Sequence, residues 1–167
     1  MKKILVLALA AFTMAACDGK QTSTTTVTHA SDINGVVTKS SMQMSNYALR
    51  AALGNNTTTA AYVTITNTGN QADRLVSASC TCASSASLHT MAMKDGVMEM
   101  GEPKDGFAIA PGQSIVFAPG GNHIMLQGVT AHPKEGDTVK LTLNFEKAGA
   151  ITMDLPVSNT PLAKTDH

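Results

Sequence analysis

The stretch "GFAIAPGQSIVFAPGG", residues 106–121, places two short apolar runs on either side of a Pro-Gly turn and ends in a second Pro-Gly pair. Proline pre-sets the backbone angle of the first turn position and glycine allows positive φ, so both residues are typical of tight turns. This segment therefore predicts two short β-strands around a Pro-Gly turn.

The alternation of short apolar runs and turn residues continues over most of the chain. Further strands are expected in the runs at 60–69, 74–83, 86–94, 123–129, 137–149 and 150–157. The sequence has no amphipathic helical pattern and no internal repeat. About seven or eight short strands with frequent turns favour an all-β fold, an antiparallel β-sandwich or barrel.

Length and composition indicate how many domains the chain forms and which partners are excluded. The chain has 167 residues, enough for one domain with its own core. Its 12 basic and 12 acidic residues give a formal net charge of zero, and no basic block is present, so a nucleic-acid partner has no electrostatic support. Tryptophan is absent, and the core is expected to consist mainly of Leu, Val, Ile and Ala.

Residues 1–16 have the pattern of a lipoprotein signal peptide: a positive "MKK", an apolar run and small residues before Cys17. The sequence "MAAC" resembles a bacterial lipobox, with Met14 where leucine is usual, so Cys17 is expected to carry lipid. Such a protein is anchored on the periplasmic side of a membrane, and Asp18 favours the inner membrane. Ordinary cleavage near the same place, giving a soluble periplasmic protein, is the alternative.

The remaining segments divide the chain into a tether, one domain and a tail. Residues 17–40 are rich in Ser and Thr and predict a flexible tether. Residues 41–158 contain the expected strands and form the candidate domain. Residues 159–167 are polar and are expected to be a loose tail.

The segment "LHTMAMKDGVMEM", residues 88–100, predicts a β-hairpin that gathers methionines. A two-residue turn at Asp95-Gly96 sets three pairs of residues opposite each other across the hairpin. Because side chains alternate along a strand, the histidine and four methionines then share one face. The expected pairs are Met93 with Met98, Met91 with Met100, and His89 with Glu102.

A second segment repeats the combination, since His123 and Met125 are two residues apart and point to one face of a strand. A single methionine usually fills a core, and that interpretation suits Met153. It suits the hairpin poorly, because histidine is not a usual core partner and the hairpin tip should be exposed to water. Thioether sulfur with imidazole nitrogen suits Cu(I), which makes the two segments a candidate Cu(I) site.

Spacing connects the two segments. Met100 follows His89 after ten residues (90–99), and His123-Ile124-Met125 follows Met100 after twenty-two (101–122). This arrangement resembles the motif of the periplasmic PCu(A)C copper chaperones, in which His and Met are ten residues apart and His-x-Met follows after about twenty-one. The similarity extends over roughly residues 46–157 and includes "AAYVTITNTGNQADRLVSAS", "MKDGVMEM", "PGGNHIML" and "GDTVKLTLNFEKAG".

The resemblance implies a cupredoxin-like antiparallel β-sandwich with Greek-key connections. It also implies a non-catalytic carrier that delivers Cu(I) to a recipient such as a cytochrome oxidase subunit or another copper chaperone. Carried over to this sequence, the copper ligands are His89, Met100, His123 and Met125. Met91 is an additional candidate ligand, and Met93 and Met98 are interpreted either as a soft transfer surface or as merely exposed methionines.

Cys80-Thr81-Cys82 departs from the usual pattern of the family. On a strand both sulfurs would face one side. A local disulfide, two inert thiols, an additional thiolate copper site and a redox switch are all compatible with this spacing.

Two other functions compete with copper delivery. A copper storage or resistance lipoprotein would use the same site with a different partner. An electron-transfer cupredoxin would need a cysteine thiolate beside its histidine ligands, and no Cys lies near His123 in the sequence.

Overall fold

The computed structural model describes residues 37–159 except 40, 53 and 131. The expected signal peptide, Cys17, most of the expected tether and residues 160–167 lie outside the described residues. Strand β1, Val37–Lys39, lies inside the segment expected to be tether and pairs with the next strand. The folded part of the chain therefore includes residues before position 41.

The described residues contain strands and no helix, so none of them forms a helix that could cross a membrane. The strands that follow β1 are β2 (Met42–Arg50), β3 (Thr58–Asn67), β4 (Asp73–Cys80), β5 (Ala83–Lys94), β6 (Val97–Gly101), β7 (Phe107–Ile109), β8 (Ser114–Phe117), β9 (His123–Val129), β10 (Thr138–Phe145) and β11 (Gly149–Ser158).

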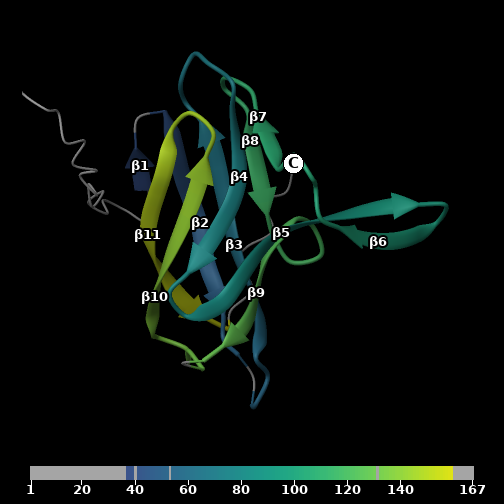
Figure 1. The fold of residues 1–167 in the computed structure, drawn as a ribbon, viewed down its shortest axis with the longest axis vertical. Helices are drawn as coiled ribbons and strands as arrows, with labels where there is room; N and C mark the ends of the chain where they lie inside the picture. The colour runs from purple at the N-terminus through teal and green to yellow at the C-terminus, as the bar shows by residue number, and fades with distance from the viewer. Residues whose placement is uncertain (1–36, 40, 53, 131, 160–167) are drawn as a thin grey trace, which may run out of the picture.

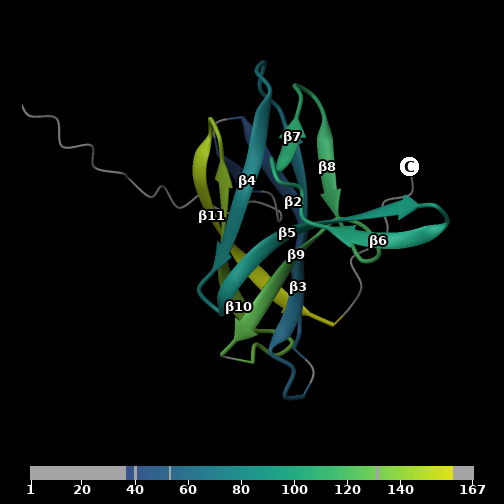
Figure 2. The same cartoon turned by 45° about the vertical axis from the view of Figure 1, so that its right-hand side comes forward.

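The strands form one hydrogen-bonded path in the order β6-β5-β9-β3-β2-β11-β10-β4-β7, with β1 on β2 and β8 on β3. This path folds over so that β4, β7, β10 and β11 face β2, β3, β8 and β9 (Figures 1 and 2). The neighbours that are not consecutive in sequence are crossovers of the kind found in Greek-key sandwiches. The predicted all-β, cupredoxin-like sandwich of a single domain is therefore confirmed.

Strand pairing departs from a purely antiparallel sandwich at one place, in the middle of the hydrogen-bonded path. β11 runs parallel to β2 over Val157↔Leu49 and Ser158↔Arg50, whereas the other strand pairs are antiparallel. Parallel neighbours need a long connection rather than a hairpin. The sequence signals for local turns could not reveal this contact, because it joins the two ends of the domain.

The core follows from alternation along each strand. β11 points Ile151, Met153, Leu155 and Val157 inward, and the residues between them are half-buried or exposed. Met153 is 3% exposed, which confirms its interpretation as a core methionine. Met42 and Met44 of β2 are also fully buried, although nothing in the local sequence distinguished them.

The segment 74–83 is not one continuous strand. β4 ends at Cys80 and β5 begins at Ala83, so Thr81 and Cys82 form the turn between them. Cys80 and Cys82 are joined by a disulfide, with their Cα atoms 5.2 Å apart. The strand expected across the two cysteines is therefore wrong, and the local disulfide is the alternative that the structure contains.

The β5–β6 hairpin projects from the sandwich, as Figures 1 and 2 show. Asp95 and Gly96 both have positive φ, 51° and 82°, as a two-residue type I′ turn requires. The register sets Met91 opposite Met100 and Met93 opposite Met98, which confirms the predicted pairs. All five residues of β6 are exposed, so the hairpin is held by its backbone pairing and not by a core of its own.

A buried carboxylate connects the start of β4 to the β10–β11 turn. Asp73 is 6% exposed. Its Oδ1 accepts hydrogen bonds from the backbone N–H of Arg74 (2.7 Å) and Lys147 (2.9 Å), and its Oδ2 accepts one from Ala148 (2.8 Å). Burial by itself raises the pKa of this carboxyl, but the three backbone donors and the Lys147 charge outweigh burial and leave the pKa below its usual value.

The substitution Asp73→Asn should lower the free energy of unfolding at neutral pH and make that free energy depend less on pH in acid. The amide side chain cannot accept all three backbone hydrogen bonds, and each buried N–H that loses its acceptor costs about 1–3 kcal/mol. The folded-state pKa is lowered, so the wild-type contribution is complete above the unfolded value of about 3.9 and is lost as pH falls through the lower folded value.

Urea unfolding of both proteins from about pH 2 to 7 measures this difference, because the unfolding free energy of the variant should change less below about pH 4. Equal pH slopes in the two proteins would contradict the assigned role of Asp73.

Candidate metal centre

The site begins on the outer face of β9. Along this strand Ile124 and Leu126 are fully buried in the core, whereas His123 and Met125 are half-buried on the opposite face. Alternation along one strand therefore brings the second His-x-Met segment to the outer surface of the sandwich.

β5 places the first histidine directly beside the second. The antiparallel register pairs His89 with His123 and Ser87 with Met125. The two imidazole rings are stacked, with centroids 5.3 Å apart and planes inclined by 25°. The structure therefore brings together, in adjacent strands, two histidines that lie far apart in the sequence.

A hydrogen bond indicates which ring nitrogen of His123 carries the proton. Its Nδ1 lies 3.0 Å from the carbonyl oxygen of Gly121. A carbonyl oxygen only accepts, so Nδ1 carries the proton and donates it to this bond. In the neutral ring, Nε2 then retains its lone pair and can bind a metal ion.

His89 has the opposite arrangement. Its Nε2 lies 3.2 Å from Oε1 of Glu102 and 2.8 Å from Oγ of Ser87. The carboxylate accepts a hydrogen bond from Nε2–H, and the lone pair of the neutral ring then lies on Nδ1. This Nδ1 is buried without a hydrogen-bond partner, so its lone pair is not used in the protein. The predicted proximity of His89 and Glu102 is confirmed.

The hairpin completes an open pocket of about 280 Å³ beside His123. Met91 and Met100, which are directly opposite each other, line it together with His123 and Met125. Met91 is half-buried, whereas Met100 is 51% exposed. Three of the four ligands expected from the sequence therefore line one pocket, whereas His89, which stacks against His123, is not among the lining residues.

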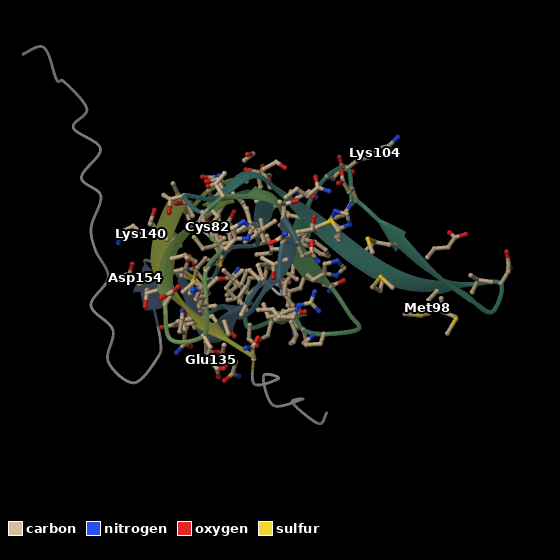
Figure 3. The ribbon with its side chains drawn as sticks, turned by 90° about the horizontal axis from the view of Figure 1, so that it is seen from below. Cys82, Met98, Lys104, Glu135, Lys140 and Asp154 are labelled. Atoms are coloured by element: carbon tan, nitrogen blue, oxygen red, sulfur yellow. A yellow bond between two sulfur atoms is a disulfide. The ribbon has the colours of Figure 1, made fainter. Side chains whose placement is uncertain are left out.

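Met93 and Met98 lie farther along the hairpin and do not line this pocket. They are 67% and 47% exposed. Figure 3 shows Met98 on the projecting hairpin, well outside the sandwich. The structure thus divides the methionines of the hairpin into a pair at the pocket and a pair near the tip.

Cys80 and Cys82 do not belong to the pocket. They form the β4–β5 turn, at the opposite end of β5 from the hairpin, and Figure 3 shows Cys82 on the side of the molecule away from Met98. In a disulfide neither sulfur is a thiolate, the form that binds metals. The additional thiolate site is therefore incompatible with the oxidised form in this structure.

The pocket also contains residues that the sequence did not single out. Arg50 and Tyr62 line it from β2 and β3, and Ala60 pairs with Met125 across β3 and β9. The small side chain of Ala60 leaves room beside the methionine. These residues come from strands far away in sequence, so no local spacing identified them. Ser87 does not line the pocket, but it contacts His89, and alternation along β5 alone places it on the same face.

No group of three or more His, Cys, Asp or Glu side chains gathers in a metal-binding arrangement within the part of the chain that the structure describes. The pocket is lined by one imidazole and three thioethers, and its only other neutral side-chain donors are the hydroxyl groups of Thr58, Thr59 and Tyr62, with no carboxylate or thiolate among the described lining residues. A metal ion bound there would depend on sulfur from methionine. Such a donor set selects a soft monovalent ion over zinc, calcium or magnesium.

Comparison with a family of known sequences covers the sandwich from β2 to β11. Residues 42–157 match the family described as "Putative lipoprotein LpqE-like". A curated relative from Leifsonia xyli subsp. xyli (strain CTCB07), "Putative lipoprotein Lxx21020", is 38% identical over 101 residues, which are 60% of this chain and 61% of that protein. The match thus spans less than two thirds of the relative.

Solved structures with the same fold include copper-binding domains. The copper-bound PCuAC domain from PmoF2 is 26% identical, with a TM-score of 0.63 over 75% of this chain and 98% of that domain. The apo PCuAC domain from PmoF1 is also 26% identical, with a TM-score of 0.63 over 75% of this chain and 99% of that domain. The Cu(I) form of DR1885 from Deinococcus radiodurans, 24% identical with a TM-score of 0.57 over 76% of this chain and 83% of that protein, shares the fold. The chain therefore belongs to the LpqE-like family, and its sandwich is a PCuAC-type domain.

Proposed function

We propose that this protein is an extracytoplasmic Cu(I)-binding metallochaperone. The observation that carries the proposal is the pocket in which Met91, Met100, His123 and Met125 converge from three strands. An open pocket lets an ion enter and leave, as a carrier requires. The relation to copper-bound PCuAC domains supports the same conclusion.

The proposed ligands are His123, Met125, Met100 and His89. His123 offers Nε2, and its orientation is held by the hydrogen bond to Gly121. His89 offers Nδ1, the buried nitrogen without a partner. Met91, which lines the pocket opposite Met100, is the alternative fourth ligand. Thioethers stay available in an oxidising compartment, where free thiols are lost to disulfides.

Delivery rather than catalysis is the proposed role. The donors fill the coordination of a soft ion and provide no nucleophile and base arranged for turnover. The recipient is a copper protein such as a cytochrome oxidase subunit or another copper chaperone. A copper storage or resistance lipoprotein is the alternative with the same site. An electron-transfer cupredoxin is disfavoured, because the described cysteines are joined in a disulfide outside the pocket.

Replacing a pocket methionine should weaken Cu(I) binding without unfolding the domain. Met100→Leu and Met125→Leu keep similar volume and delete the sulfur, so folding should change by less than about 1.5 kcal/mol. The Cu(I) affinity should fall at least about tenfold, which corresponds to about 1.4 kcal/mol. Anaerobic titration against a chromophoric Cu(I) chelator measures the affinity.

The matched control is Met153→Leu, which changes a core methionine that does not line the pocket. Its Cu(I) affinity should equal that of the wild type. X-ray absorption of the 1:1 complex separates the two candidate ligand sets, because His89 adds nitrogen and Met91 adds sulfur. Wild-type affinity in both Met100→Leu and Met125→Leu would refute the site.

Loss of the protein should distinguish delivery from storage. A deletion strain grown at low copper should lose cytochrome oxidase activity, and wild-type protein, but not His123→Ala, should restore it. Oxidase activity and growth are measured over a range of copper concentrations. Normal oxidase activity combined with sensitivity at high copper would favour storage or resistance instead.

The proposed location is the periplasmic face of a bacterial membrane, with the inner membrane favoured, through lipid on Cys17. The lipoprotein relatives support this location. Mass spectrometry of membrane-extracted protein should detect a diacylglyceryl group on Cys17, and Cys17→Ser should remove it. An unmodified N-terminus in a soluble wild-type protein would support the alternative of a soluble periplasmic carrier.

A further inference from the structure

Exposed apolar side chains are concentrated on one element. Among the described residues, five large hydrophobic side chains are strongly exposed, and four of them lie on the β5–β6 hairpin: Met93, Val97, Met98 and Met100. The hairpin buries none of them against the sandwich. Exposed apolar side chains concentrated on one projecting element are typical of a site of interaction.

Register divides these residues between the two faces of the hairpin. Met93 is directly opposite Met98, and Met91 is directly opposite Met100. Side chains two residues apart share a face, so the four methionines form one face. Val97 and Glu99 lie in the intervening positions and belong to the other face.

The spacing of this face suits a soft cation. Directly opposite residues have Cβ atoms about 4.5–5.5 Å apart, within reach of two flexible thioethers that bind one ion. Consecutive pairs are about 6.6–6.8 Å apart along the strand. Each methionine pair is therefore close enough to its neighbour for an ion to move between them.

The two pairs differ in exposure. At the tip, Met93 is 67% exposed and Met98 47%. At the base, Met91 is half-buried and lines the pocket of His123 with Met100. The methionine face thus runs from solvent to the metal pocket.

We propose that Met93 and Met98 form a second, outer Cu(I) site that exchanges the ion with the pocket through Met91 and Met100. This inference rests on the proposed function of the pocket. In each step one Cu–S bond forms as another breaks, copper remains Cu(I), and no proton or electron moves. The outer site lacks imidazole and is open to water, so it binds more weakly than the pocket.

Silver(I) is a suitable probe, because it is soft and monovalent like Cu(I) and does not change oxidation state in air. The purified protein, with its methionine methyl groups labelled with ¹³C, is titrated with Ag(I) and followed by NMR. The first equivalent should shift the methyl signals of Met100 and Met125. The second should shift those of Met93 and Met98, while the buried Met153 signal stays unchanged.

The double variant Met93→Leu/Met98→Leu should bind one equivalent of Ag(I) instead of two and keep the first. It should also take up Cu(I) from a soluble donor complex severalfold more slowly. Val97→Leu, at the same tip but on the other face, is the matched control and should behave like the wild type.

Two results would overturn the outer site: a second equivalent retained by the double variant, or unshifted Met93 and Met98 signals in the wild type. The second result would leave the hairpin face as a protein-docking surface. Failure of the pocket as a metal site gives a different result. In that case the variant His123→Ala/Met125→Leu would still bind the first equivalent of Ag(I) as the wild type does, and the methyl signals of Met93 and Met98 would still shift.

Discussion

The antiparallel register that sets His89 opposite His123 determines the rest of the candidate centre. A shift of one residue would turn the histidine of one strand into the core and expose its apolar neighbour. The apolar residues Leu88, Ile124 and Leu126 are buried, which resists such a shift. The packing of the core on one face of the sheet thus maintains the arrangement of donors on the other.

Strand β5 is shared by the sandwich and the projecting hairpin. From Ala83 to His89 it pairs with β9 in the sandwich, and from Thr90 to Lys94 it pairs with β6 in the projecting hairpin. The imidazoles and the thioether of Met125 therefore lie on the packed part, and the thioethers of Met91 and Met100 lie on the projecting part. Candidate donors held in the sheet, together with the exposed thioether of Met100, suit an ion that must be both retained and released.

The features that stabilise the sandwich are separate from the pocket. Asp73 joins β4 to the β10–β11 turn, and Cys80–Cys82 closes the β4–β5 turn. None of these three residues lines the pocket of His123. Effects on stability and effects on metal binding can therefore be measured separately, since distant sites without shared partners act almost additively.

The sequence by itself determined the local parts of this protein. Asp95-Gly96 fixed the hairpin turn and with it the pairs Met91–Met100 and Met93–Met98, because a two-residue turn leaves one register. Alternation also predicted that His123 and Met125 share a face. Strand and turn patterns favoured an antiparallel sandwich or barrel, and the resemblance to PCu(A)C chaperones narrowed this to a cupredoxin-like sandwich and matched the spacing of the candidate donors to a known motif.

Only the tertiary structure decided how distant segments meet. The stacking of His89 on His123, the contribution of Arg50 and Tyr62 to the pocket and the parallel β2–β11 contact depend on crossovers between strands far apart in sequence. The turn at Cys80–Cys82 was missed because the apolar run continues through it, and alternation carries no signal for where a strand reverses. Local periodicity reports which side a residue faces, and the packing of the whole core selects its neighbours.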